Sequence, residues 1–278
     1  MIDEAFLTTR FVNVNGITTR YADYGRGPTT ILLIHGFPEN LQGWRRNVPA
    51  LSSHFRVIAL DMVGFGETDK ADWDYTCMGL AKFVKSFLEA LGIPKVHVVG
   101  TDTGASVALA FAAEYPAATD KLIIFSGTAY PESVSAPEVR LMMIPGIGEL
   151  SMLGFAGIGT RLSVLISYRD RSRLSSTALK EYLRCLDSFR ARLIAVKCIR
   201  ALDQTALLPL QKLKKSAPPA LILWAEHDRY FYKWVPERLK SDLPGSRLEI
   251  VSDCGHFIQE EKPGFFNQRL ITFIKDNR

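Results

Sequence analysis

The feature that most constrains the fold is a set of short strand-like segments, most of which are mainly apolar. They read "ITTRYADY" (17–24), "TTILLIHG" (29–36), "FRVIALD" (55–61), "KVHVVGT" (95–101) and "KLIIFSG" (121–127). Strands that are apolar nearly throughout indicate burial on both faces of a sheet. Between them, residues 40–51, 77–91 and 105–114 carry apolar side chains at helical spacing. The alternation predicts an α/β fold with a mostly parallel central sheet flanked by helices.

The predicted secondary structure changes in the middle of the 278-residue chain. From residue 130 to 216 the strand-like runs vanish, and "TALKEYLRCLDSFRARLIAVKCIRALD" is helical by pattern. The earlier alternation returns with "ALILWAEHD" and "RLEIVSDCGH", and a last helix is expected over 263–275. We therefore predict a core domain formed by residues 1–129 and 217–278, with an inserted helical cap, or lid, at 130–216.

Charge is distributed unevenly along the chain. Residues 131–216 contain 14 Lys and Arg against 7 Asp and Glu, a net charge of +7, and the remaining residues carry −2 of the total of +5. The arginines are scattered through helical patterns, with no basic block of five and no interleaved aromatic residues. This pattern favours a solvated helical face or the steering of an anionic substrate, and no nucleic-acid partner is expected.

Cysteine usage and the first residues bear on compartment and cofactors. The four cysteines lie far apart without a C-x-x-C pair, which predicts reduced thiols, no disulfide scaffold and no metal site. No cofactor motif is present. "MIDEAFLTTR" lacks the basic start and apolar core of a signal peptide, and no run of 18 apolar residues occurs. We expect a cytoplasmic protein without membrane insertion, and no feature predicts its oligomeric state.

The segment "VVGTDTGAS" places Asp102 between Gly100 and Gly104, directly after a predicted strand. G-x-D-x-G has the spacing of the G-x-S-x-G nucleophile elbow, in which small neighbours let the central residue protrude at a strand-to-helix turn. Aspartate is already an anion at neutral pH and needs no activating base. Attack on an sp³ carbon with a leaving group would give an ordinary ester, so Asp102 predicts an epoxide or an alkyl halide as substrate.

Other strand ends carry residues that suit the hydrolysis of such an ester. Ligands of parallel sheets sit beyond the carboxyl ends of the strands. There, His256 is expected to act as general base and Asp228 to orient its imidazole, in the chain order nucleophile, acid, histidine. The backbone N–H groups of Phe37 and Thr103 are expected to stabilise the oxyanion.

Two more residues of the loop "HGFPEN", His35 and Pro38, are candidates for the substrate-binding site. His35 has an alternative interpretation as a residue that only hydrogen-bonds the backbone.

The segments "LLIHGFPENLQGWRRNVPALSSHFRVIALDMVGFGETDK", "VVGTDTGAS", "LILWAEHDRYF" and "CGHFIQEEKP" together resemble the α/β-hydrolase superfamily. The resemblance is to its aspartate-nucleophile branch, which contains epoxide hydrolases, haloalkane dehalogenases and fluoroacetate dehalogenases. It covers about residues 11–125 and 220 to the end, and it implies a covalent alkyl-enzyme mechanism under a cap that contacts the substrate.

Within that branch, "HGFPE" resembles the epoxide hydrolases, whose two cap tyrosines donate hydrogen bonds to the epoxide oxygen. Tyr168 and Tyr182 are the candidates for this role in the cap. Thr103 and Phe37 stand where haloalkane dehalogenases usually have tryptophan and asparagine or glutamate. Thr103 and Ser106 replace the carboxylate-clamping arginines of fluoroacetate dehalogenases.

The prediction is therefore an epoxide hydrolase-like enzyme that acts on a medium-sized, hydrophobic small-molecule substrate. A dehalogenase of an organic halide remains an alternative. So do a non-hydrolytic lyase or cyclase and a small-molecule receptor that keep the same fold.

Overall fold

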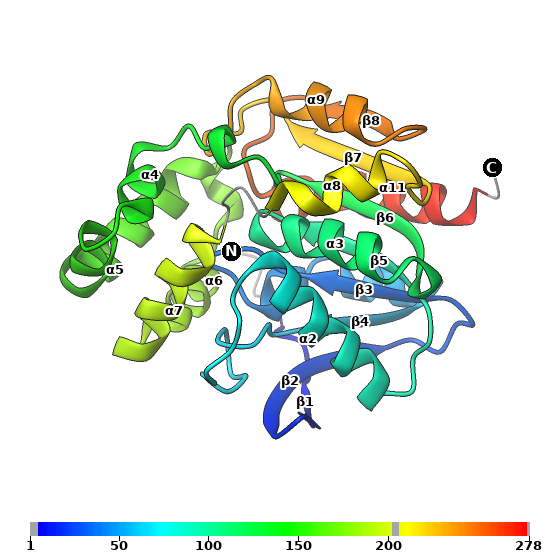
Figure 1. Ribbon diagram of the computed structural model, residues 1–278, viewed down its shortest axis with the longest axis horizontal. Coiled ribbons are helices and arrows are strands. Elements are labelled where there is room, and N and C mark those ends of the chain that lie inside the picture. The colour runs from blue at the N-terminus through cyan, green and yellow to red at the C-terminus, as the bar shows by residue number, and fades with distance from the viewer. Residues whose placement is uncertain (1–4, 202–205, 277–278) are drawn as a thin grey trace.

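The protein folds around one eight-stranded sheet, which lies beside a group of helices (Figure 1). The computed structural model describes residues 5–201 and 206–276. The strand order is β1-β2-β4-β3-β5-β6-β7-β8, with antiparallel pairing of β1 with β2 and of β2 with β4, and parallel pairing elsewhere. The strands are β1 (Arg10–Val14), β2 (Ile17–Tyr24), β3 (Thr30–Ile34), β4 (Arg56–Leu60), β5 (Val96–Thr101), β6 (Thr119–Phe125), β7 (Ala220–Ala225) and β8 (Arg247–Val251).

The central strands are apolar throughout because successive residues enter different cores. Leu32 and Ile34 of β3 belong to a core on one face, whereas Ile31 and Leu33 belong to a core on the other. Such alternation buries every side chain of a strand that is covered by helices on both sides. The prediction of a mostly parallel sheet flanked by helices is confirmed.

Helices cover both faces of this sheet. On one face lie α2 (Cys77–Ala90), α3 (Thr103–Glu114) and α9 (Val235–Asp242), and on the other α1 (Val48–Ser52) and α11 (Pro263–Lys275). The helix expected over 40–51 is interrupted. It forms a short 3₁₀ helix, Leu41–Trp44, whose first turn is capped by the Asn40 side chain, and α1 begins separately with Pro49 in its first turn.

A short helix, α10 (Ile258–Glu261), precedes α11, and the residues between β6 and β7 form a further group of helices. These are α4 (Pro137–Met143), α5 (Ile147–Ser167), α6 (Ser176–Leu183), α7 (Phe189–Arg200) and α8 (Leu207–Leu213). Helices α4, α5 and α7 pack on one another, whereas α8 packs against α3 of the core. The domain limits at 130 and 216 therefore stay a prediction. Within the described ranges, no single helix is long and apolar enough to cross a membrane.

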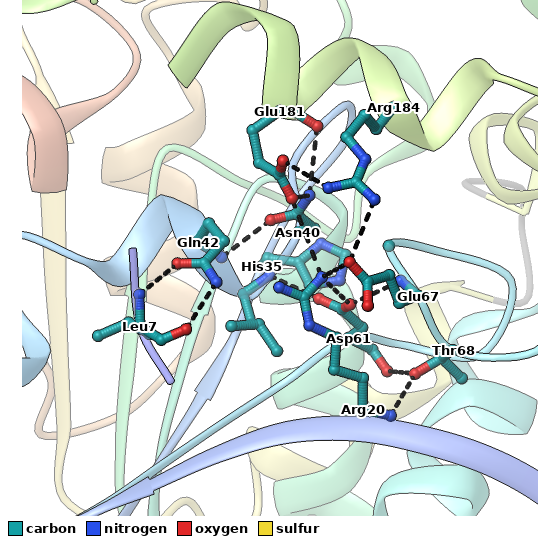
Figure 2. Close-up of polar contacts among 12 residues, drawn as sticks. Leu7, Arg20, His35, Asn40, Gln42, Asp61, Glu67, Thr68, Glu181 and Arg184 are labelled. Atoms are coloured by element: carbon teal, nitrogen blue, oxygen red, sulfur yellow. Dashed lines mark hydrogen bonds and ion pairs between the residues drawn. The ribbon is translucent and has the colours of Figure 1, made fainter. Parts of the chain in front are cut away.

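A buried ionic cluster joins α6 to the sheet (Figure 2). The guanidinium of Arg20, on β2, lies 3.4 Å from Asp61 and 3.9 Å from Glu181. Glu181 also accepts hydrogen bonds from Asn40 (3.1 Å) and from Arg184 (3.0 Å). Burial raises the pKa of Asp61 to about 6, although Arg20 lowers it. The cluster fixes α6 over the loop that follows β3.

A second buried polar group holds the same loop from the other side. Glu39 accepts a hydrogen bond from Gln259 (2.7 Å) and another from the backbone N–H of Gly36 (3.3 Å). Nearby, Arg45 forms a bidentate pair with Glu260, with contacts of 2.5 and 2.8 Å. Burial raises the pKa of Glu39 to about 8, and the charge of Glu260 adds to the rise.

The raised pKa of Glu39 gives a testable pH dependence of stability. Between about pH 5 and 8 the folded chain keeps this proton while the unfolded chain releases it, so stability falls as the pH rises, by at most about 1.4 kcal/mol per pH unit. In Glu39→Gln this contribution is absent. Unfolding by urea at pH 5, 6, 7 and 8 should show a shallower decline of the free energy of unfolding for the variant.

The exposed Glu237 supplies a matched control, because Glu237→Gln removes a carboxylate that faces water. This variant should keep the wild-type slope. Since Gln offers an N–H where Gly36 needs an acceptor, Glu39→Gln should also lose stability at every pH. Only the slope reports the titration, and equal slopes in Glu39→Gln and the wild type would contradict the assignment.

Candidate active site

Asp102 lies at a sharp turn between β5 and α3. Its backbone is in the left-handed region, with φ of 51°, which is uncommon for a residue other than glycine. Two glycines allow neighbouring backbone to come close to it. A Cβ on Gly36 would meet the Asp102 Cβ at 2.5 Å, and one on Gly104 would meet the His35 carbonyl oxygen at 2.4 Å. A Cβ on Gly100, the first glycine of the G-x-D-x-G motif, would meet the Gly104 carbonyl oxygen at 2.3 Å, so small residues are required on both sides of Asp102.

The Asp102 carboxylate is held by backbone donors. The N–H of Phe37 donates to Oδ1 over 2.9 Å, and the N–H of Thr103 also hydrogen-bonds this carboxylate. Burial raises the pKa of Asp102 above its ordinary value of 3.8, while His256 and both N–H groups act in the opposite direction. The N–H groups of Phe37 and Thr103, the expected oxyanion donors, both contact the Asp102 carboxylate, and that of Phe37 does so at Oδ1.

His256 and Asp228 complete a buried trio with Asp102. The Nδ1 of His256 lies 2.9 Å from Asp228 Oδ2, and its Nε2 lies 3.8 Å from Asp102 Oδ2. Asp228 Oδ1 accepts the backbone N–H of Tyr230 (2.9 Å). Burial lowers the pKa of His256, but the two carboxylates outweigh this and leave it raised. The trio matches the geometry of a nucleophile, a base and the group that orients the base.

A cavity of about 310 Å³ opens above the trio. Asp102, His35, Phe37, Pro38 and Thr103 line it at the core side. Most other lining residues are apolar and come from α4, α5, α7 and the loops of the core; they include Met62, Phe65, Leu80, Val139, Met142, Met152, Val164 and Ile199. Its size and lining suit a medium-sized apolar ligand.

His35 lines the cavity, but both of its ring nitrogens are already bonded to backbone groups and are not free to bind a ligand. Its Nδ1 contacts the carbonyl oxygen of Gly36 (2.8 Å), and its Nε2 accepts the backbone N–H of Met62 (3.1 Å). Burial lowers the pKa of His35 to about 4, which favours the neutral ring. The ring of His35 borders the cavity, so its place in the substrate-binding site stays a prediction, while both nitrogens hold the loop as the alternative interpretation proposed.

The predicted cap donors Tyr168 and Tyr182 do not line the cavity, and this expectation is wrong for the structure described here. Tyr168 stacks on Phe257, with ring centroids 4.8 Å apart, and the Tyr182 hydroxyl donates to Glu260. Both side chains are buried in one cluster with Phe257, the residue after His256. The resemblance to epoxide hydrolases pointed to tyrosines in this segment, but it did not show which neighbour each would meet.

The tyrosines at the cavity are Tyr75 and Tyr230, which the sequence reasoning missed. Tyr75 donates its hydroxyl to the carbonyl oxygen of Ala71 (2.7 Å). The Tyr230 hydroxyl lies 2.8 Å from Ser163 Oγ, and its ring meets the His256 ring edge-on at 4.6 Å. The available signal was the position of Tyr230 only two residues after Asp228, on a loop at the active edge of the sheet.

A metal site is not formed by the part of the chain described: no group of three His, Cys, Asp or Glu side chains could hold an ion there. The polar groups around the cavity are the carboxylates of Asp102 and Glu138, the His35 ring, cysteine thiols and several hydroxyl groups. The arrangement is therefore suited to nucleophilic and acid–base chemistry by its own side chains.

Comparison with known proteins agrees with this geometry. A model of the alpha/beta hydrolase fold family matches residues 29–146 and 166–263. The uncharacterized hydrolase YugF of Bacillus subtilis is 27% identical over 274 residues, covering 98% of this chain and 100% of the relative. The 2-hydroxy-6-oxononadienedioate/2-hydroxy-6-oxononatrienedioate hydrolase of Escherichia coli K12 is 29% identical, covering 96% of each chain.

Solved structures show the same fold. Cfl2 of Burkholderia cenocepacia superposes with a TM-score of 0.87 at 23% identity, covering 99% of this chain and 98% of the other. The epoxide hydrolase CorEH gives 0.83 at 24%, covering 98% and 99%, and the ancestral haloalkane dehalogenase AncHLD2 gives 0.84 at 23%, covering 95% and 98%. With a family match over more than half of its length, the chain belongs to the α/β-hydrolase family and is a hydrolase of that fold.

Proposed function

We propose that this hydrolase opens epoxides through a covalent ester on Asp102 and acts on medium-sized, hydrophobic substrates. The observation that carries the proposal is a carboxylate at the elbow, with its Oδ2 3.8 Å from His256 Nε2 and its Oδ1 held by backbone N–H groups. A carboxylate that faces an apolar cavity is suited to attack a neutral sp³ carbon.

In the first step, Asp102 Oδ2 attacks an epoxide carbon and the carbon–oxygen bond of the ring breaks. The ring oxygen leaves as an alkoxide and needs a proton. Tyr230 is suited to supply it, because burial raises the pKa of its hydroxyl to about 12 and so keeps it protonated at neutral pH. The Tyr230 hydroxyl lies 2.8 Å from Ser163 Oγ, where either oxygen can be the donor, and this contact holds the hydroxyl at the cavity wall.

In the second step, His256 takes a proton from water, and the resulting hydroxide attacks the Asp102 carboxyl carbon. Negative charge develops on Oδ1, at the N–H groups of Phe37 and Thr103, while Asp228 stabilises the imidazolium. The ester bond breaks, and the leaving alkoxide takes the proton from His256. The carboxylic acid left on Asp102 returns its proton to the Tyr230 phenolate, so one water and one epoxide give one diol.

The lining of the cavity supports a neutral substrate. No Lys or Arg lines it among the described residues, although the Escherichia coli relative is named for dioates, which carry two carboxylates. No tryptophan lines it in the same described ranges, and the residue after Asp102 is Thr103. From the resemblance, a dehalogenase is expected to bind its halide through a tryptophan N–H. Because no tryptophan lines the cavity among the described residues, the cavity favours epoxides over organic halides as substrates.

Trapping of the ester tests the proposal. In His256→Gln, Asp102 should still attack while hydrolysis fails, so intact-protein mass should rise by the mass of styrene oxide and persist for hours. The turnover of styrene oxide to the diol should fall by at least about 1,000-fold, since the general base is lost.

The matched control is the double variant Asp102→Asn/His256→Gln, which keeps the shape of the site but lacks the nucleophilic carboxylate. It should show no mass increase. If the adduct forms in the double variant, or forms in neither protein with any epoxide, Asp102 is not the nucleophile. Diol formation that survives Asp102→Asn alone would also contradict the mechanism.

The assignment of Tyr230 as proton donor is tested by Tyr230→Phe. Loss of one positioned donor to a developing oxyanion costs about 100-fold in rate, so single-turnover ester formation should slow by that factor. Tyr168→Phe is the matched control, because it removes a buried hydroxyl that does not reach the cavity, and its rate should stay within about threefold of the wild type. The opposite ranking of the two variants would return the role to Tyr168.

A further inference from the structure

Half of the exposed large apolar side chains of the described residues lie in one segment of the cap. Fourteen such side chains are exposed in all, and seven of them fall between residues 141 and 166. These seven are Leu141, Ile144, Ile147, Leu150, Ile158, Leu162 and Ile166. We call them the cap apolar face. Single exposed leucines are ordinary on protein surfaces. Seven exposed large apolar side chains within one short segment instead indicate a surface that binds another apolar surface.

Helix α5 is apolar on two sides. One side, with Met152, Ala156 and Val164, lines the cavity above Asp102. The other carries Leu150, 71% exposed, and Ile158, 78% exposed. Figure 1 shows α5 on the outer side of the cap, away from the sheet. A helix that is apolar all round is normally covered all round, so the outer side lacks a cover in this chain.

The shape of α5 suits a surface rather than a span. Its halves, Ile147–Gly154 and Ala156–Ser167, together reach the apolarity of a membrane helix but meet at 91°. A helix bent by that angle cannot cross a bilayer in one pass, whereas it can lie with its apolar side in the interface.

Charge on the face indicates the kind of partner. Arg140 and Arg161 are exposed beside Leu141 and Leu162, and neither forms an ion pair with a described residue. The acidic residues of α4 and α5 are both neutralised: Glu138 pairs with Arg229, and Glu149 with Arg200. The segment therefore combines exposed apolar side chains with two exposed arginines that form no ion pair with a described residue, and residues 131–216 as a whole carry +7. Anionic lipid headgroups over acyl chains complement this pattern.

From these observations we infer that the cap apolar face docks this enzyme on anionic lipid surfaces, from which its hydrophobic substrate enters the cavity. Leu141 connects the two surfaces, because it lines the cavity and is also 43% exposed on the face. A substrate dissolved in lipid would pass Leu141 without crossing bulk water. The docking stands on the face itself, whereas the delivery of substrate rests on the proposed function.

Vesicle binding tests the docking. Wild-type protein should co-sediment with vesicles of phosphatidylcholine containing 30% phosphatidylglycerol. Binding should weaken at 500 mM relative to 50 mM NaCl, because salt screens the arginines. Leu150→Ser/Ile158→Ser/Leu162→Ser should lower the affinity at least about 100-fold. Arg140→Gln/Arg161→Gln should lower it about 25-fold, at about fivefold for each arginine.

Phe11→Ser is the matched control, since Phe11 is 53% exposed and lies on the edge strand β1, remote from the cap in sequence. The affinity of this variant for the vesicles should equal that of the wild type. Absence of wild-type binding to the anionic vesicles would overturn the docking, as would equal binding of the triple variant. A dimer that forms without vesicle binding and dissociates in the triple variant would show instead that the face binds a second copy.

A paired assay separates this inference from the proposed function. The triple variant should hydrolyse styrene oxide in water at the wild-type rate, but an epoxide dissolved in the vesicles at least about tenfold more slowly. Equal rates on the vesicle-borne epoxide would overturn delivery. Vesicle binding without hydrolysis of either epoxide would leave the docking in place and contradict the proposed function alone.

Discussion

Burial of the Asp102 carboxylate at a left-handed turn is the constraint on which the rest of the site depends. An unpaired buried carboxylate would cost several kcal/mol, so donors and a partner cation must reach it. Two loops provide them: the loop after β3 supplies the Phe37 N–H, and the loop after β8 supplies His256. The loop after β3 can approach only because Gly36 and Gly104 have no side chain in the way. The backbone geometry around Asp102 is therefore what allows its carboxylate to be stabilised by hydrogen bonds and by His256.

The loop after β3 extends that requirement to the cap. Two residues beyond Phe37, Glu39 is held by Gln259, and the next residue, Asn40, donates to Glu181 of α6. The segment that positions an N–H at Asp102 thus also anchors the helical insertion, through the ionic cluster in Figure 2. A shift of α6 would change the position of the Phe37 N–H, because Asn40, which contacts α6, is only three positions after Phe37 in the chain.

Much of this arrangement was predictable because strand ends of a parallel sheet converge. Asp102, Asp228 and His256 each follow a strand, so their order and type predicted a meeting that the structure shows. Strand β1 was missed, because an antiparallel edge strand exposed along most of its length lacks a continuous apolar run. The cap tyrosines were misplaced for a different reason. Periodicity predicts which side of a helix is buried, but stacking on Phe257 and bonding to Glu260 depend on tertiary contacts.

Under the proposed function, the charge of Asp102 and the apolar lining of the cavity restrict the substrate together. Burial raises the pKa of Asp102, because its carboxylate anion is poorly solvated. Formation of a bond to carbon removes this negative charge and so relieves the cost of burying it. The same burial would repel an anionic substrate, and no Lys or Arg among the described lining residues would compensate for a carboxylate. Glu138, the other carboxylate at the cavity, is already paired with Arg229. Neutral electrophiles with apolar bodies are the class that both conditions admit.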